Sequence, residues 1–129
     1  MRYLDSSVVI AELFLEERRP PDDFWTGSLV TSRLLEYEVW TQIHAKRLGE
    51  SRGEEVRFVL GRLSMLDLDP PILARALEPF SRPIRTLDAI HLASADFLRA
   101  RGQDVSIATY DVRMGAVALE MGFELYPLE

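Results

Sequence analysis

The sequence predicts an α/β fold of three layers, in which helices cover both faces of a short, mostly parallel central sheet. Three observations support this class. Short apolar runs that suit strands alternate along the chain with longer segments of helical spacing. Residues that typically start or stop helices bound most of these longer segments. Parallel strands require helical crossovers between them, so the alternation itself favours a parallel sheet.

The expected strands are short and apolar, as strands buried on both faces of a parallel sheet usually are. They cover residues 3–4, 29–31, 105–108 and 123–126. The first two are brief apolar runs, and the third is the clearest buried strand. The fourth is bounded by Gly122 and Pro127, which favour turns at its two ends.

The expected helices carry apolar residues at intervals of three or four positions. In chain order they cover residues 6–19, 33–48, 54–63, 71–80, 87–101 and 112–121. The residues that can cap a first turn are Ser6 or Ser7, Ser32 and Thr86. The glycines that can end a helix are Gly49, Gly102 and Gly122.

Length and hydrophobicity indicate the organisation of the chain. With 129 residues, of which 47% are hydrophobic, it has the size of one domain, so we expect a single domain over residues 1–129. No apolar run approaches the ~20 residues needed to cross a bilayer. Asp5 also interrupts the start, where a secretory signal would be apolar. We therefore expect a cytoplasmic protein that does not contact a membrane.

Charge and cysteine content restrict the chemistry. A net charge of −6 argues against sequence-independent binding of nucleic acid by an overall basic surface. It does not exclude a nuclease, because acids at a metal site add to the formal charge while local basic patches still guide a polyanion. The chain has no cysteine, so any metal must be held by oxygen or histidine.

Four acidic residues stand where they could meet at one end of the predicted sheet. Asp5 follows the first strand and Asp111 follows the third. Asp88 lies in the first turn of one helix, and Glu38 lies near the start of another. Functional groups of parallel α/β sheets gather beyond the carboxyl ends of the strands. If these four converge, they form an all-oxygen site that suits Mg²⁺ or Mn²⁺.

Electrostatic repulsion explains why such a site implies a cation. Two carboxylates ~4 Å apart at an effective dielectric constant near 20 oppose each other by about 4 kcal/mol. A bound divalent ion would offset this repulsion, lower the pKa of a water molecule and offset charge on a scissile phosphate. The corresponding reaction is phosphodiester hydrolysis.

Each acid also has a structural interpretation. Asp5 and Asp111 are placed as helix caps, and the helix dipole favours Asp88 in a first turn. For Glu38 the alternative is surface charge, and the helical wheel does not separate it from Glu36 because apolar residues surround both. Spacing alone is a weak signal for this set.

Other polar residues are expected to have structural roles. Asp96, eight residues after Asp88, points about 80° away around the helix, which favours surface charge. His91 and His44 each lack a second histidine three to five residues away, so a zinc pair is not expected. We expect His91, within an apolar helix, to be packed and hydrogen-bonded.

Two segments carry a recognisable pattern. Residues 3–7, Tyr-Leu-Asp-Ser-Ser, and residues 85–93, Arg-Thr-Leu-Asp-Ala-Ile-His-Leu-Ala, resemble the most diagnostic stretches of VapC-type PIN-domain toxins. Thr109-Tyr110-Asp111 resembles the fourth acidic position of that family. The interval from Ser32 to Glu38 resembles the second. The resemblance spans nearly the whole chain, and it is the reason to prefer Glu38 over Glu36, which stays open.

The resemblance implies a PIN-like fold and a metal-dependent endoribonuclease that acts as the toxin of a type II toxin-antitoxin system. It implies Asp5 and Asp88 as principal metal ligands, with Glu38 and Asp111 completing the acidic pocket directly or through water. Ser7 and Thr109 would be supporting hydroxyls, and Asp111 is included among the metal ligands. Many relatives have a basic residue three positions after the helical Glu, where this chain has Thr41. The substrate contact expected there is therefore in doubt.

The resemblance also implies partners. We expect an RNA substrate, Mg²⁺ with Mn²⁺ as the alternative cofactor, a homodimer, and a VapB-like antitoxin whose C-terminal segment covers the acidic groove. Exposed apolar residues on the first helices could supply the antitoxin surface. Which RNA is cut does not follow from the sequence.

Other protein classes with an early Asp fit less well. A receiver domain needs a strand-end lysine, whereas the one lysine, Lys46, lies in mid-helix. A haloacid dehalogenase-like phosphatase needs a second Asp where this chain has Ser7. A ribonuclease H-like enzyme places its first Asp in an antiparallel meander, whereas a helix follows Asp5 at once. The remaining rival is a catalytically inactive PIN-like binding or scaffold module, against which the presence of all four acids weighs.

Overall fold

The centre of the fold is a five-stranded sheet with the order β3-β2-β1-β4-β5, in which each neighbouring pair is parallel. The structure is a computed structural model and describes residues 1–128. The strands are β1 (Arg2–Leu4), β2 (Leu29–Ser32), β3 (Ser64–Leu66), β4 (Ser106–Ala108) and β5 (Glu124–Leu125). The predicted mostly parallel α/β class is confirmed.

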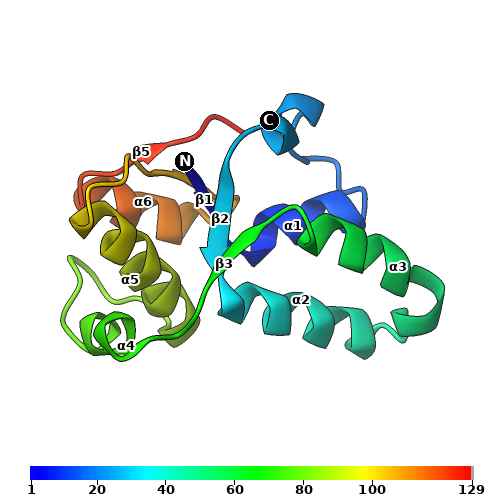
Figure 1. The fold of residues 1–129 in the computed structure, drawn as a ribbon, viewed down its shortest axis with the longest axis horizontal. Coiled ribbons are helices and arrows are strands. Elements are labelled where there is room, and N and C mark those ends of the chain that lie inside the picture. Colours follow the sequence, from blue (N-terminus) through cyan, green and yellow to red (C-terminus); the bar gives the residue numbers. More distant parts are fainter. Residues whose placement is uncertain (129) are drawn as a thin grey trace.

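Helices cover both faces of this sheet. They are α1 (Ser6–Leu13), α2 (Arg33–Ala45), α3 (Gly49–Leu60), α4 (Pro70–Ala76), α5 (Thr86–Ala100) and α6 (Val112–Glu120), with a short 3-10 helix at Asp22–Thr26. Figure 1 shows α1, α2 and α3 on one side of the sheet and α4, α5 and α6 on the other. Within residues 1–128, no helix combines the length and apolar character needed to cross a membrane.

Alternation along the strands creates two apolar layers. Leu4 and Leu29 belong to the core cluster that includes the buried residues of α1, α2 and α3. Their strand neighbours Tyr3 and Val30 point the other way and pack with residues of α5 and α6. Successive side chains of a strand face opposite sides of a sheet, so short strands can serve both layers. This explains why β1, β2 and β4 each carry two consecutive buried hydrophobic residues, one for each layer.

Several helix ends differ from those predicted. The first helix, expected up to residue 19, ends at Leu13, and Leu15 takes a left-handed conformation with φ of 48°. The helix expected to run to residue 48 ends at Ala45, because Arg47 takes a left-handed conformation with φ of 55° that an α-helix cannot contain. The next helix starts at Gly49 rather than at 54. Its first turn is charged and lacks apolar residues, so the periodic signal begins later than the helix does.

Two elements were not predicted from the sequence. The 3-10 helix at Asp22–Thr26 is short, and β3 is a three-residue strand at the sheet edge that pairs with β2. As an edge strand, β3 is hydrogen-bonded along one side and is partly exposed, so it lacks the run of apolar residues that identifies a buried strand.

Thr86 begins α5 instead of capping it, because Arg85 occupies the cap position.

The sheet has a switch in its connections between β1 and β4, which are neighbours. The chain leaves β1 into α1 on one face and leaves β4 into α6 on the opposite face. A crevice forms where connections diverge in this way, beyond the carboxyl ends of the two strands. Asp5 and Asp111 lie on these two connections.

Candidate active site

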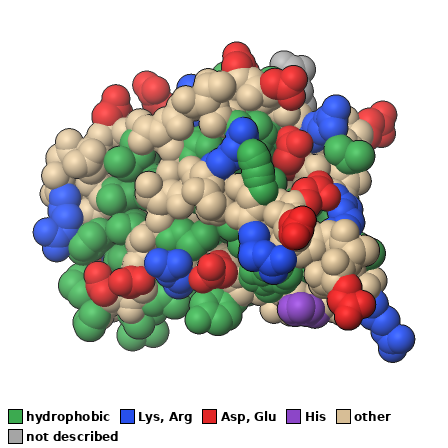
Figure 2. Space-filling view, turned by 45° about the vertical axis from the view of Figure 1, so that its right-hand side comes forward, with side chains coloured by type: hydrophobic (Ala, Val, Ile, Leu, Met, Phe, Trp, Pro, Cys, Tyr) green, Lys and Arg blue, Asp and Glu red, His purple; other side chains and the backbone are tan. Residues whose placement is uncertain are grey.

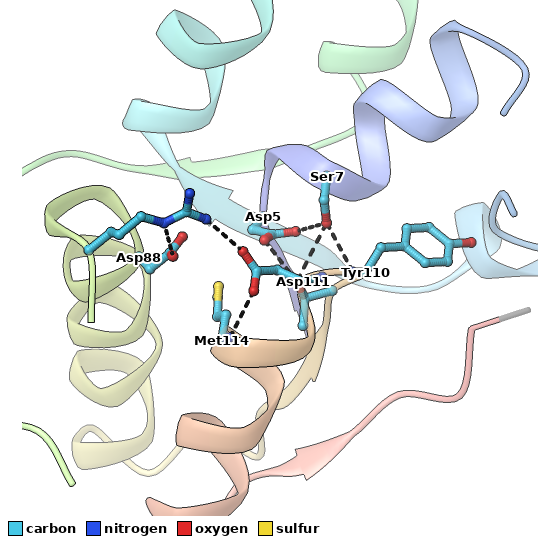
Figure 3. A network of polar contacts seen from close by, with 8 residues as sticks. Asp5, Ser7, Asp88, Tyr110, Asp111 and Met114 are labelled. Atoms are coloured by element: carbon cyan, nitrogen blue, oxygen red, sulfur yellow. Dashed lines mark hydrogen bonds and ion pairs between the residues drawn. The ribbon is translucent and has the colours of Figure 1, made fainter. Parts of the chain in front are cut away.

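An acidic pocket of about 500 Å³ lies at this switch point. All four acids that the sequence singled out line it, namely Asp5, Glu38, Asp88 and Asp111. Each comes from a different part of the fold: the end of β1, the start of α2, the first turn of α5 and the N-terminus of α6. Figure 3 shows Asp5, Asp88 and Asp111 directed toward one another. Residues far apart in the sequence therefore share one site.

Asp5 is held by two hydroxyl groups. Ser7 Oγ donates to one carboxylate oxygen at 2.5 Å, and Thr109 Oγ1 donates to the other at 2.8 Å. The two hydroxyl oxygens in turn accept from the backbone N–H groups of Tyr110 and Asp111, each at 2.9 Å. Asp5 occupies the cap position of α1, yet its side chain accepts no helix N–H. Its carboxylate is thus oriented into the pocket rather than used as a cap.

Burial perturbs two of the acids. Asp5 is 4% exposed, and its burial raises its pKa to about 6 although Ser7, His91 and Thr109 favour the charged form. Burial also raises the pKa of Asp88, and the charge of Asp111 raises it further, while Arg85 opposes both effects. Desolvation and like charge both disfavour carboxylates. The pocket therefore concentrates negative charge that calls for a compensating cation.

Arg85 supplies positive charge to this pocket. Its guanidinium donates to Asp111 Oδ2 at 3.0 Å, and its Nε lies 3.4 Å from Asp88 Oδ2. The arginine side chain is 70% exposed, so it reaches the acids from solvent. Asp111 also caps α6 by accepting the backbone N–H of Met114 at 3.0 Å. The predicted capping role and a place in the pocket are thus compatible for Asp111.

Glu38 and Glu36 point to different places. Glu38 faces the acidic pocket, where its Oε1 lies 2.6 Å from His91 Nε2. Glu36 instead pairs with Arg33 at 3.5 Å and lines a separate pocket beside Trp40. The helical wheel could not distinguish Glu38 from Glu36, because the side of α2 that faces the site depends on its contact with α5, in which His91 meets Glu38.

His91 is buried and hydrogen-bonded, as the sequence suggested. It is 1% exposed, and its Nδ1 lies 2.8 Å from the hydroxyl of Tyr3, which is fully buried.

Asp96 lies outside the acidic pocket, where it pairs with Arg75 and Arg99. This placement agrees with the surface role expected for Asp96.

Some residues of the pocket were missed by sequence reasoning. Arg85 and Gln42 line the pocket, and neither of them was given a role in the site from the sequence. Gln42 lies one helical turn after Glu38, so its spacing was the available signal. Thr41, the position at which relatives often carry a basic residue, does not line the pocket, whereas its neighbour Gln42 does.

The residues fit a hard divalent ion in their chemistry. The donors are carboxylate oxygens. Within residues 1–128, Asp88 Oδ2 is a buried oxygen with no hydrogen bond of normal geometry, and its contact is the ion pair with Arg85 at 3.4 Å. Among residues 1–128, no three acidic or histidine side chains stand close enough together to hold one ion as they are arranged. The guanidinium of Arg85 lies against Asp88 and Asp111 in this arrangement. Binding of an ion would therefore require these side chains to draw together.

Comparison with known proteins identifies the family. The profile of the PIN domain matches residues 2–120. The chain is 38% identical to Ribonuclease VapC46 of Mycobacterium tuberculosis, over 93% of this chain and 92% of that protein. It is 28% identical to Ribonuclease VapC47 of the same species, over 95% and 93% of the two chains.

Solved structures share the fold. A toxin-antitoxin complex from Klebsiella pneumoniae has a chain that matches with a TM-score of 0.62 at 16% identity, over 90% of this chain and 91% of that one. PAE2754 from Pyrobaculum aerophilum also matches with a TM-score of 0.62, at 20% identity, over 89% and 84% of the chains. The profile match and the 38% identical relative together place this chain in the PIN-domain family, among its VapC-type members.

Proposed function

We propose that this chain is a Mg²⁺-dependent endoribonuclease that hydrolyses RNA phosphodiester bonds and acts as the toxin of a toxin-antitoxin pair. The observation that carries the proposal is the convergence of four acids, from four separate elements, on one pocket at the switch point of the sheet. Two similar proteins, VapC46 and VapC47, are named as ribonucleases, which supports cleavage of RNA as the reaction.

The roles follow from the way each acid is held. Asp5, Asp88 and Asp111 would hold the ion, and Mn²⁺ could replace Mg²⁺ because both accept carboxylate oxygens. When bound, the ion supplies positive charge that lowers the pKa of water and offsets charge on the scissile phosphate. Ser7 and Thr109 orient the two oxygens of Asp5.

Glu38 completes the pocket as the fourth acid. It comes from the opposite helical layer to Asp88, so the pocket is acidic on both sides. Its carboxylate is 16% exposed and therefore still reachable by water and by substrate. We assign it a catalytic role, and we assign none to Glu36.

A matched pair of variants tests this assignment. Glu38→Gln should reduce the rate of RNA cleavage by about 10- to 100-fold, the loss typical of a residue that supports metal ligands. Glu36→Gln, two positions away on the same helix, should leave it unchanged because Glu36 lines a different pocket. Cleavage of a mixed RNA pool under single-turnover conditions measures both. Wild-type protein without any nuclease activity would instead favour a binding or scaffold module.

Arg85 is expected to contact both the ion site and the RNA. Because its guanidinium competes with a cation for Asp88 and Asp111, Arg85→Ala should tighten Mn²⁺ binding by about two- to fivefold, the value of an exposed ion pair. The same change should raise KM for RNA, since a cation that faces phosphate is lost. Calorimetric Mn²⁺ titration and cleavage kinetics measure the two effects.

Arg82→Ala is the control for this prediction. Arg82 pairs with Glu120, outside the acidic pocket, so neither Mn²⁺ affinity nor KM should change. Weaker Mn²⁺ binding in Arg85→Ala would contradict the competition that we expect.

We propose a homodimer and an antitoxin as the partners. An apolar groove of about 740 Å³ lies between α4 and the start of α5, beside Leu73 and Leu77, which are 39% and 89% exposed. Hydrophobic side chains gather at the lower left of Figure 2, on the side where α4 lies in Figure 1. Exposed apolar patches of this kind mark protein interfaces, and we assign this one to a second copy of the chain.

The antitoxin would cover the acidic pocket. A relative of similar fold was solved as a toxin-antitoxin complex, which supports such a partner. The apolar residues within α1 are buried, so the first helix offers less of the expected apolar antitoxin surface than its sequence suggested. A cytoplasmic location is consistent with an enzyme that acts on cellular RNA.

A further inference from the structure

A chain of buried hydrogen bonds links the core to Glu38. Tyr3, in the central strand β1, contacts His91 Nδ1 through its hydroxyl at 2.8 Å. His91 Nε2 then contacts Glu38 Oε1 at 2.6 Å. Tyr3 is fully buried and His91 is 1% exposed, whereas Glu38 opens to the acidic pocket. The chain thus runs from β1 through α5 to α2.

The direction of the hydrogen bonds follows from the groups themselves. An ionised carboxylate can only accept, so His91 Nε2 must carry the proton that it shares with Glu38. In the neutral ring Nδ1 is then an acceptor, which the Tyr3 hydroxyl can satisfy. A phenol carries its proton at neutral pH and can donate it to Nδ1, which lies 2.8 Å from the Tyr3 hydroxyl. Tyr3 therefore selects the ring form that donates to Glu38.

Packing alone does not account for this arrangement. A buried phenol and a buried imidazole are costly unless their polar atoms are paired, whereas Phe and Leu would fill the same layer without that requirement. Both pair here, and the last partner in the chain is a pocket acid. Two of the other pocket acids are also held by hydrogen bonds, Asp5 by two hydroxyls and Asp111 by a backbone N–H.

We propose that Tyr3 and His91 are positioning residues, which fix the Glu38 carboxylate in the acidic pocket through a single imidazole tautomer. This rests on the ribonuclease function proposed above. A glutamate side chain on a helix surface has several rotamers, and ordering it in one of them costs side-chain entropy. The contact with His91 selects one rotamer before RNA binds, so its loss should lower kcat more than it raises KM.

A spectroscopic experiment tests the chain independently of activity. Long-range ¹H–¹⁵N spectra of the imidazole side chains should show a proton on Nε2 of His91, with Nδ1 as the acceptor. Tyr3→Phe should shift this tautomer balance toward Nδ1, and Glu38→Gln should shift the Nε2 proton resonance. His44, which is exposed and stacks on Trp40, serves as the internal reference and should not respond. A proton on Nδ1 in the wild type overturns the proposal, whatever the RNA assay shows.

Two isosteric variants separate the two contacts in the kinetics. Gln places its amide nitrogen near the position of Nε2, and Asn places its amide near that of Nδ1. His91→Asn should therefore lower kcat by about 10- to 100-fold, as losing an outer partner of a metal site does, with little change in KM. His91→Gln should retain more activity because it can still donate to Glu38. His44→Asn is the control and should cleave as the wild type does.

A double-mutant cycle shows whether His91 acts through Glu38. In the Glu38→Gln background, His91→Asn should cause little further loss of kcat, because residues that act through one contact are not additive. Equal losses in both backgrounds would overturn the proposal. Thermal unfolding shows whether each variant is folded. If His91→Asn does not fold, kcat of Tyr3→Phe, which removes one oxygen only, is measured in its place. Inactivity of the folded wild type would count against the ribonuclease function instead, and the spectra would then decide the hydrogen-bond chain.

Discussion

Asp5→Asn is expected to stabilise the metal-free protein at neutral pH and to lower RNA cleavage by more than about 100-fold, beyond the loss of an outer-shell partner. The stability gain comes from the buried carboxylate, whose pKa rises from 3.8 to about 6 in the folded protein. Asparagine has a similar shape and no charge, so it should remove this penalty. The loss of cleavage follows because a neutral amide is a poor ligand for Mg²⁺.

The pH dependence of this gain has a definite sign. Below pH 3.8 the carboxyl is protonated in both folded and unfolded protein, so it costs nothing. As the pH rises toward 6, the unfolded state loses the proton first, and the folded state becomes progressively less stable. Above pH 6 the full penalty is present, on the order of 3 kcal/mol for this pKa difference. Asp5→Asn should therefore gain up to about 3 kcal/mol at pH 7.5 and almost nothing near pH 4.

Urea unfolding in EDTA at several pH values measures this gain as the difference between variant and wild type. Asp69→Asn is the matched control, because Asp69 also occupies a helix cap position without a capping hydrogen bond but is exposed to solvent. Asp69→Asn should show no gain of this kind at pH 7.5, because the side chain of Asp69 is already in contact with water. A variant at position 5 that is less stable than wild type at pH 7.5, or that still cleaves RNA, would contradict the role given to Asp5.

Removing divalent ions is expected to abolish cleavage and to lower the stability of the wild type. Mn²⁺ at 100 times its Kd should raise the free energy of unfolding by about 2.7 kcal/mol, because the ion binds the folded site and not the unfolded chain. EDTA should reverse both effects. Asp88→Asn should remove the stabilisation, since Asp88 lines the pocket and its carboxylate faces a cation there, the exposed guanidinium of Arg85, which an ion would replace.

Asp96→Asn is the control on the same helix. Asp96 pairs with Arg75 and Arg99 outside the pocket, so this variant can lose some stability yet should keep the full difference between Mn²⁺ and EDTA. Unfolding curves with and without the ion measure that difference within each variant. Equal Mn²⁺ stabilisation in Asp88→Asn and wild type would place the ion elsewhere.

The strands and helices that local pattern could reveal were largely predicted. The alternation of apolar runs and helical spacing identified the parallel α/β class, and β1, β2, β4 and all six helices lie where this pattern indicated. Local spacing depends on the periods of the backbone itself, 3.6 residues in a helix and two in a strand. Elements without such a pattern were not predicted. An example is β3, which is defined by its hydrogen bonds to β2.

For the candidate site, too, the residues were predictable from local pattern but their tertiary contacts were not. Asp5, Asp88 and Asp111 were found from their places after strands or at a helix start, but what their carboxylates contact was not predictable. Capping of α1 was the structural alternative for Asp5, whereas hydroxyls two and 104 residues away hold its carboxylate. A capping preference is a local tendency, and a better partner brought close by the fold replaces it.

By itself, the sequence determined the class of fold, the extent of most elements and the set of acids that could form an oxygen site. Tertiary structure alone decided that Glu38 and not Glu36 faces the pocket, that Arg85 lies against Asp88 and Asp111, and that His91 joins Tyr3 to Glu38. The physical reason is distance along the chain. Helix and strand periods act over a few residues, whereas these contacts join residues up to 88 positions apart and exist only once the helices have packed on the sheet.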